Sequence, residues 1–157
     1  MSVEAKLMEL GIQLPPPPPA VAAYEPWMRT GNLILTSGQL PWKNGELAFS
    51  GKCGAEITED QGYKAARQCA INAISQLKAA AGDLDRVRQI VKVDGYVHTA
   101  PGFRGHPQVL NGASELILSV FGERGCHARL AVGIDEMPLN AAVQICVTAE
   151  IEDYPIS

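Results

Sequence analysis

The sequence predicts an α+β domain in which one mixed β-sheet carries two helices on one face. Residues 126–152 hold two segments in which apolar and polar residues alternate, separated by a turn that contains Pro138. Two stretches with helical periodicity, 58–81 and 107–121, each end at a glycine. A third alternating segment, 87–98, lies between the helices, and two short strands precede them. The predicted order is therefore ββαβαββ.

Residues 1–20 form a leader to a core that covers 21–157, and the whole chain is expected to be one domain. Apolar residues at helical spacing predict a short amphipathic helix over residues 3–10, which ends at Gly11. The prolines Pro15–Pro19 cannot continue a helix and favour an extended segment. We interpret this segment as a stiff spacer that lays the first helix on the core. A ligand for a proline-recognition domain is the alternative.

A β-hairpin is predicted at the start of the core. Its strands, Trp27–Arg29 and Asn32–Thr36, flank Gly31, which together with the next residue supplies the positive φ angles of a tight turn. The second strand ends at Ser37 and Gly38. The glycine permits close approach of the backbone to another group, and the serine offers a hydroxyl.

The first long helix begins with a capping box formed by Thr58 and Gln61 and runs to about Ala81. The alternating segment that follows places Val91, Val93, Gly95 and Val97 on one side and Lys92, Asp94, Tyr96 and His98 on the other. The second helix runs from Pro107 to Phe121. Because both helices cover the same face of the sheet, the face with Tyr96 and His98 is expected to be buried by self-association.

The last two strands carry the candidate site. The first of them has Ala128, Leu130, Val132 and Ile134 on one side and His127, Arg129, Ala131 and Gly133 on the other. Arg129 is the only fixed positive charge of its side. Its small neighbours leave room for a ligand beside its planar fork of donors, which pairs with carboxylates. A structural ion pair or a subunit contact is the alternative.

Composition excludes several classes of protein. With 13 Lys and Arg against 17 Asp and Glu, the net charge is -4, so a nucleic-acid partner is not expected. The N-terminus lacks the uninterrupted apolar run of a signal peptide or membrane span. The four cysteines form no C-x-x-C pair, and His98, His106 and His127 are scattered. Neither a metal site nor structural disulfides are therefore expected, and the chain is predicted to be cytoplasmic.

Two blocks of the sequence resemble the signatures of a known family. Ala128-Arg129, an alternating strand, Met137-Pro138 and then Val143–Ile145 resemble the closing signature of the Rid family. These proteins are the reactive intermediate deaminases, also called YjgF-like or L-PSP proteins. Residues 31–41, GNLILTSGQLP, resemble the other hallmark of the family, near its N-terminus. The resemblance covers most of residues 20–153, and the proline-rich leader resembles a longer branch of the family.

The resemblance implies a chorismate-mutase-like α+β fold and a homotrimer with ligand sites in the clefts between subunits. It also implies a reaction, the hydrolysis of 2-imino and enamine acids such as 2-aminoacrylate to 2-keto acids and ammonia. No metal or organic cofactor is required for this chemistry. An older label of the family is endoribonuclease, which an acidic chain does not favour.

The family's site residues can be carried over by position. Arg129 matches the arginine that binds the substrate carboxylate, and Tyr24 and Asn111 match residues that line the pocket. Backbone groups around Gly31 and Gly38 are candidates to hold the amine and the water, with Ser37 beside them. As alternatives, Tyr24 packs beside the proline segment and Asn111 is an ordinary helix residue. The cysteine that many members carry beside the arginine is replaced by Ala131.

Gln144 stands where active members of the family carry a glutamate that faces the attacking water. A glutamine can hold a water through its carbonyl but cannot take up a proton. If the glutamate is a general base, hydrolysis by this chain should be slower by roughly 10²-fold or more. The first hypothesis is thus an imine deaminase with Arg129 and Gln144 as its catalytic residues. The alternative is a non-catalytic trimer that binds small carboxylates, and a ribonuclease or translation inhibitor is the third.

Overall fold

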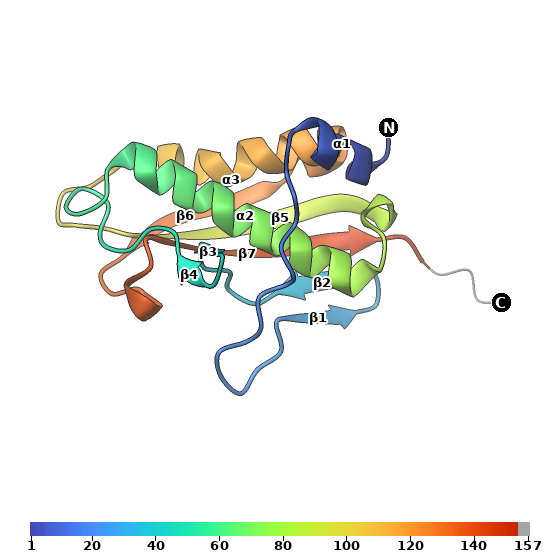
Figure 1. Cartoon of the computed structure of the whole chain (residues 1–157), viewed down its shortest axis with the longest axis horizontal. Helices are drawn as coiled ribbons and strands as arrows, with labels where there is room; N and C mark the ends of the chain where they lie inside the picture. The colour runs from blue at the N-terminus through green and yellow to red at the C-terminus, as the bar shows by residue number, and fades with distance from the viewer. Residues whose placement is uncertain (154–157) are drawn as a thin grey trace.

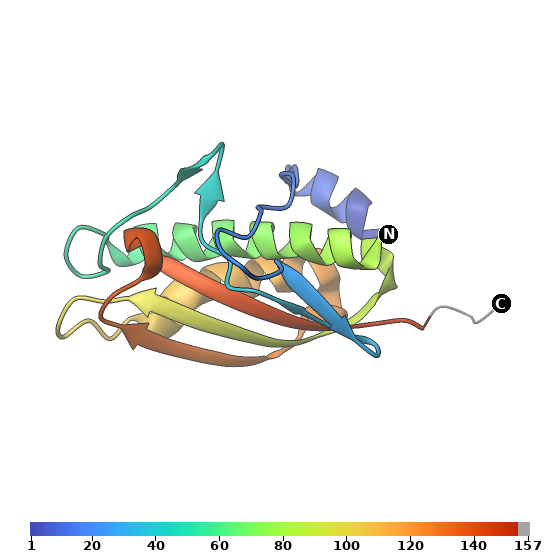
Figure 2. The same ribbon diagram turned by 90° about the horizontal axis from the view of Figure 1, so that it is seen from below.

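The computed structural model describes residues 1–153 and confirms the predicted α+β fold (Figure 1). Two long helices, α2 (Glu59–Ala81) and α3 (His106–Phe121), lie on the same face of a five-stranded sheet, as Figure 2 shows. In chain order the elements are α1 (Val3–Glu9), β1 (Trp27–Thr30), β2 (Leu33–Thr36), β3 (Trp42–Lys43), β4 (Glu46–Leu47), α2 (Glu59–Ala81), η1 (Leu84–Arg86), β5 (Val87–His98), α3 (His106–Phe121), η2 (Gly122–Gly125), β6 (Ala128–Ile134), η3 (Pro138–Asn140) and β7 (Val143–Ile151).

The sheet has the strand order β1-β2-β7-β5-β6. Strands β5 and β6 are parallel and are connected through α3, whereas the other neighbouring pairs are antiparallel. Between β2 and β7, Leu35 faces Thr148 but Gln39 faces Ile145, so the β2 side contains one extra residue. An extra residue on one strand bends it and redirects its side chains. The irregular stretch is Ser37 and Gly38, which the sequence singled out.

Both long helices have the predicted ends. Thr58 and Gln61 form the capping box of α2, and Gly82 ends that helix. Alternate residues of β7, from Val143 to Ile151, are buried beneath the helices. The buried face of α2 is rich in alanine, which lets the two helices and the sheet approach closely. The core therefore lies between the helices and one face of the sheet.

The leader packs against α2 instead of extending into solvent. The hydroxyl of Ser75 donates a hydrogen bond to the Pro15 carbonyl (2.6 Å), and the Gln76 side chain donates to the Pro18 carbonyl (2.7 Å). In Figure 1 the chain after α1 crosses α2 before it reaches β1. These contacts agree with the interpretation of the prolines as a spacer that lays α1 on the core.

Strand β6 turns its apolar side away from the helices, unlike an ordinary half-buried strand. Its apolar residues Leu130 and Val132 are 38% and 37% exposed, on the face of the sheet without helices. Arg129 lies on the other side, against α3. Because β6 is an edge strand whose polar side is covered by α3, the apolar side is left on the open face.

Two details of β5 differ from the prediction. Val91, expected on the same side as Val93, is 40% exposed, because the pairing with β7 shifts register between Ile90 and Lys92. His98, expected on the uncovered face, is only 1% exposed, and its Nε2 lies 3.1 Å from the Asp135 carbonyl oxygen. The loop after β6 thus covers the end of β5.

A hairpin formed by β3 and β4 lies beside the main sheet, with Asn44 and Gly45 in its turn. Leu40, Met137 and Ala141 form a small second core there. Within residues 1–153, no helix combines the length and the apolar character that crossing a membrane requires.

The buried thiol of Cys53 leads to a prediction on alkaline stability. Burial, and secondarily the charge of Glu59, raises its pKa from 9.0 to about 11. The folded state therefore favours the neutral thiol, so the stabilisation from this group is full below pH 9 and is lost as the pH rises towards 11. In thermal melts, Cys53→Ala should lose less stability than the wild type over this pH range. Equal slopes for the two proteins would contradict the prediction.

Candidate functional site

Arg129 projects from β6 onto the first turns of α3. Its Nη1 donates hydrogen bonds to the side-chain oxygen of Asn111 (2.9 Å) and to the hydroxyl of Ser114 (3.3 Å). Its Nη2 donates to the Pro107 carbonyl oxygen (3.5 Å). All three acceptors are neutral, and no carboxylate of residues 1–153 forms an ion pair with this arginine. The guanidinium is thus held in place while its charge is left for an anion.

His127 supports Arg129 indirectly. Its Nδ1 lies 2.6 Å from the Gly125 carbonyl oxygen, which can only accept, so Nδ1 carries the hydrogen. The other ring nitrogen, Nε2, then accepts from the Ser114 hydroxyl at 2.8 Å. This arrangement turns the lone pairs of the serine oxygen towards Arg129. His127 and Ser114 are therefore positioning residues for the arginine.

The strand beyond Arg129 carries only small side chains on the same side, Ala131 and Gly133. A Cβ atom at Gly133 would lie 2.5 Å from Nε2 of His106 and 2.8 Å from the Thr99 hydroxyl oxygen. The histidine, which is the first residue of α3, therefore occupies the space that the glycine leaves. These residues lie where α3 packs against β6, a contact that we call the seam.

Gln144 belongs to a second group, at the irregular end of β2. A Cβ atom at Gly38 would lie only 2.6–2.9 Å from the side-chain amide of Gln144. The Oε1 atom of Gln144 is buried and has no hydrogen-bond partner among residues 1–153. The hydroxyl of Ser37 is already engaged, because it donates to the Glu25 carbonyl oxygen (2.5 Å). Gly38 thus makes the close approach predicted for it, and its neighbour is Gln144.

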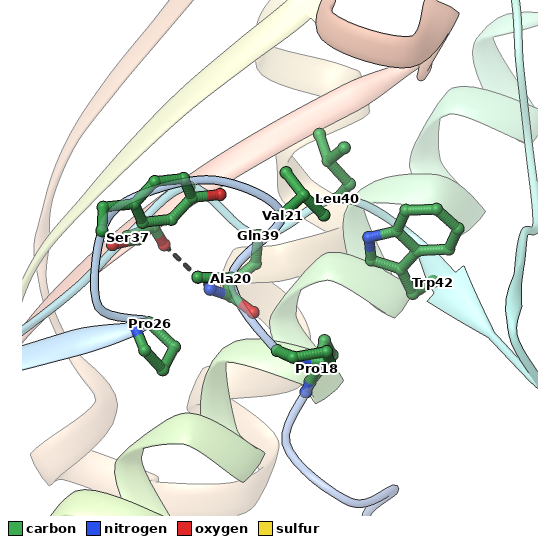
Figure 3. A pocket seen from close by; sticks show the side chains of 11 residues that line it. Pro18, Ala20, Val21, Pro26, Ser37, Gln39, Leu40 and Trp42 are labelled. Atoms are coloured by element: carbon green, nitrogen blue, oxygen red, sulfur yellow. Dashed lines mark hydrogen bonds between the residues drawn. The ribbon is translucent and has the colours of Figure 1, made fainter.

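A small cavity adjoins Gly38 and is lined by Tyr24, Ser37 and Gln39 together with leader residues (Figure 3). Its volume of about 30 Å³ is enough for one water molecule. Gln39 donates to the Ser37 carbonyl oxygen (3.0 Å), the bond dashed in Figure 3. Gln76 in turn donates to Gln39 (3.4 Å) and to the leader, so the wall of this cavity is tied to α2.

A single chain does not bring all the predicted site residues together. Arg129 lies with Asn111 on the helix side of β6, whereas Gln144 lies with Gly38 on the open side of β7, and β5 separates the two strands. Two strand spacings amount to about 10 Å.

Gly31 joins neither group. It forms the turn between β1 and β2, where the Asn32 carbonyl oxygen accepts from the Ile151 amide (2.8 Å) at the far end of β7 from Gln144. In the part of the chain that the structure describes, no side chain lies within 4 Å of where its Cβ would be. Within residues 1–153, no three His, Cys, Asp or Glu side chains gather into a potential metal site.

Sequence reasoning missed His106 and Ser114 as members of the site. A signal for Ser114 was present, because Pro107, Asn111 and Ser114 follow one another at spacings of four and three residues and so share one face of α3. His106 carried no such signal, since its contact with Gly133 depends on how α3 crosses β6.

The family model "YjgF/chorismate mutase-like, putative endoribonuclease" matches residues 4–151. Protein TCP17 of Trypanosoma cruzi is 43% identical over 152 residues, which are 96% of this chain and 95% of that protein.

Two crystal structures are also similar over nearly the whole chain. A "putative endoribonuclease" from Shewanella oneidensis has a TM-score of 0.94 and 38% identity, covering 96% of this chain and 100% of its own. Protein Atu1372 from Agrobacterium tumefaciens, described as of unknown function, has a TM-score of 0.89 and 42% identity, covering 96% of this chain and 92% of its own.

Proposed function

Because the chain belongs to the YjgF/chorismate mutase-like family, also called the Rid family, we propose that it binds small 2-imino and 2-keto carboxylic acids and hydrolyses the imines. The products are a 2-keto acid and ammonia. The observation that carries this proposal is the arginine at position 129, which three neutral acceptors hold and which no carboxylate of residues 1–153 neutralises.

The free edge of this arginine suits a carboxylate. Both Nη1 hydrogens are used by Asn111 and Ser114, and Nη2 makes one long bond to Pro107. The Nε hydrogen and the second Nη2 hydrogen lie along one edge of the guanidinium and match the two oxygens of a carboxylate. Arg129 therefore binds the acid group common to imine substrate and keto product.

The complete site forms between subunits of a homotrimer. Apolar side chains that are each at least 37% exposed lie at both edges of the open face of the sheet, on β1 and β2 (Met28, Leu33 and Leu35) and on β6 (Leu130 and Val132). Burial of these side chains favours association. Arg129 itself lies on the helix side of β6, so the cleft that joins it to Gly38 and Gln144 of the next subunit, as the family resemblance implies, forms at the β6 edge of that interface.

Gln144 positions the attacking water in this site. Its buried Oε1, which has no hydrogen-bond partner in the described part of the chain, accepts a hydrogen bond from that water next to Gly38. Glutamine cannot take up the proton that the water releases. This limitation favours a second candidate function, in which the same pocket captures small carboxylates through Arg129 without turnover.

Gln144→Glu is expected to raise the rate of imine hydrolysis by roughly 10²-fold, because it adds a general base of nearly the same shape. In the assay, a pyridoxal-phosphate-dependent dehydratase generates 2-aminoacrylate or 2-iminobutyrate, and semicarbazide competes for the imine. Gln13→Glu, which adds the same charge to an exposed side chain of the leader, is the control.

The rate of imine hydrolysis by the wild type in that assay distinguishes between the two functions. Acceleration by the wild type supports a deaminase in which glutamine suffices. No acceleration by the wild type, together with activity in Gln144→Glu and binding of 2-ketobutyrate by calorimetry, supports the binding protein. A wild type that neither turns over imines nor binds keto acids would contradict both.

An RNA substrate is not favoured, although the matched family model and the Shewanella protein carry the word endoribonuclease. The chain has a net charge of -4, and Arg129 is enclosed by α3 instead of forming part of a basic groove.

A further inference from the structure

Imine hydrolysis needs a group that takes up and returns one proton, and Gln144 cannot do so. We propose, resting on the function proposed above, that His106 is the proton-transfer residue of this site. The imidazole lies on the same side of β6 as Arg129, in the seam between α3 and the strand.

The backbone places His106 next to the carboxylate-binding group. Pro107, whose carbonyl oxygen accepts from Arg129 (3.5 Å), directly follows His106 in the first turn of α3. The imidazole reaches from this turn to Gly133, where its Nε2 would be 2.5 Å from a Cβ atom. Phe103 supports the ring edge-on, with the ring centres 5.7 Å apart. The histidine therefore has a defined position in the site.

Only small side chains lie between the two groups on this side of the strand. Along β6 the side chains that follow Arg129 on its side are the methyl group of Ala131 and the hydrogen of Gly133. Four residues of strand span about 13 Å, and the arginine side chain covers part of that length. A carboxylate held by Arg129 thus places the carbon next to it above Ala131, between the guanidinium and the imidazole.

His106 suits this role better than His127, the other histidine of the seam. Both ring nitrogens of His127 are occupied, one by the Gly125 carbonyl and one by Ser114. Within residues 1–153, neither ring nitrogen of His106 has a hydrogen-bond partner. A ring nitrogen that is not engaged in the fold is available to a water or a substrate.

One proton passes from the water through His106 to the leaving amine. The oxygen of water bonds to the imine carbon of the protonated imine, the π pair of the C=N bond moves to nitrogen, and Nε2 of His106 accepts the proton from the water. The imidazolium then returns this proton to the amine nitrogen. As the C–N bond breaks, the hydroxyl becomes the carbonyl of the keto acid, and its proton leaves with ammonia as ammonium. Gln144 only holds the water.

The test uses the full chain in the dehydratase-coupled assay, with the affinity for 2-ketobutyrate measured in parallel. His106→Gln should lower kcat/KM by roughly 10²-fold and leave the affinity unchanged. Imidazole added to His106→Ala should restore part of the rate, and Gln144→Glu in the His106→Gln background should restore turnover. Gln108→Ala, an exposed change in the same turn of α3, is the control.

An active wild type with an equally active His106→Gln would overturn the role of His106 alone. A loss of affinity as large as the loss of turnover, or no rescue by imidazole, would also overturn it, because a structural role has those results. A wild type without activity or binding would overturn the proposed function as well.

Discussion

Arg129→Ala is expected to lower kcat/KM for imine hydrolysis by roughly 10³-fold. A carboxylate on the free edge of the guanidinium makes two charge-assisted hydrogen bonds, each of about 2 kcal/mol, and a loss of about 4 kcal/mol corresponds to that factor. The substitution also leaves Asn111 and Ser114 without the donor that they now share. The affinity for 2-ketobutyrate should fall together with the rate, because the bound acid group is the same in imine and keto acid.

Two further variants sharpen this experiment. Arg129→Lys keeps the charge but loses the planar fork, so it should fall between the wild type and the alanine variant. Arg88→Ala removes an exposed arginine from the neighbouring strand β5 and should leave affinity and rate as they are. If Arg129→Ala binds keto acids as tightly as the wild type, the arginine is structural and the proposed function loses its main support.

Local patterns predicted the elements of this fold because those patterns report on neighbours along the chain. The capping box at Thr58, the glycine after α2 and the alternation in β7 all appear where the sequence placed them. The order of strands in the sheet, and the face that remains open, depend on contacts between segments far apart in sequence. For this reason the sequence did not reveal that β6 turns Leu130 and Val132 outward.

The part of the candidate site around Arg129 was predictable from the sequence, but the contact between His106 and Gly133 was not. Resemblance pointed to Arg129 and Asn111, and the structure places these two side chains 2.9 Å apart. It also pointed to Gly31, which lies in a turn away from both groups. The contact between His106 and Gly133 has no local signature, because it arises only where α3 crosses β6.

Gly112→Ala is expected to lower the free energy of unfolding by about 3 kcal/mol, near the upper end of the usual effect of overpacking. Gly112 lies in α3 against α2, and a Cβ there would overlap the Tyr63 carbonyl oxygen and lie 2.9 Å from the Tyr63 carbonyl carbon and 3.2 Å from the Arg67 amide nitrogen. Because these are backbone atoms, rotating a side chain cannot relieve the overlap, and the helices must move apart. The hydrogen bond from Tyr63 to Glu115 (2.5 Å), which joins the same two helices, should weaken too.

Whether Gly112→Ala lowers or raises the free energy of unfolding distinguishes an effect of packing from an effect of helix propensity. In an exposed helix, replacing glycine by alanine stabilises by about 0.5–1 kcal/mol, so propensity alone predicts the opposite result. Gly62→Ala in α2 is the matched control, since its Cβ would meet side-chain atoms and not backbone atoms, Cys53 Sγ at 2.9 Å and Val109 Cγ2 at 3.0 Å. Urea unfolding at one protein concentration should therefore show a much smaller loss for Gly62→Ala. Equal losses in the two variants, or a more stable Gly112→Ala, would mean that α3 can move away from α2 at little cost. In that case α3, which carries Asn111, Ser114 and His106, would not be the rigid support on which the proposed site depends.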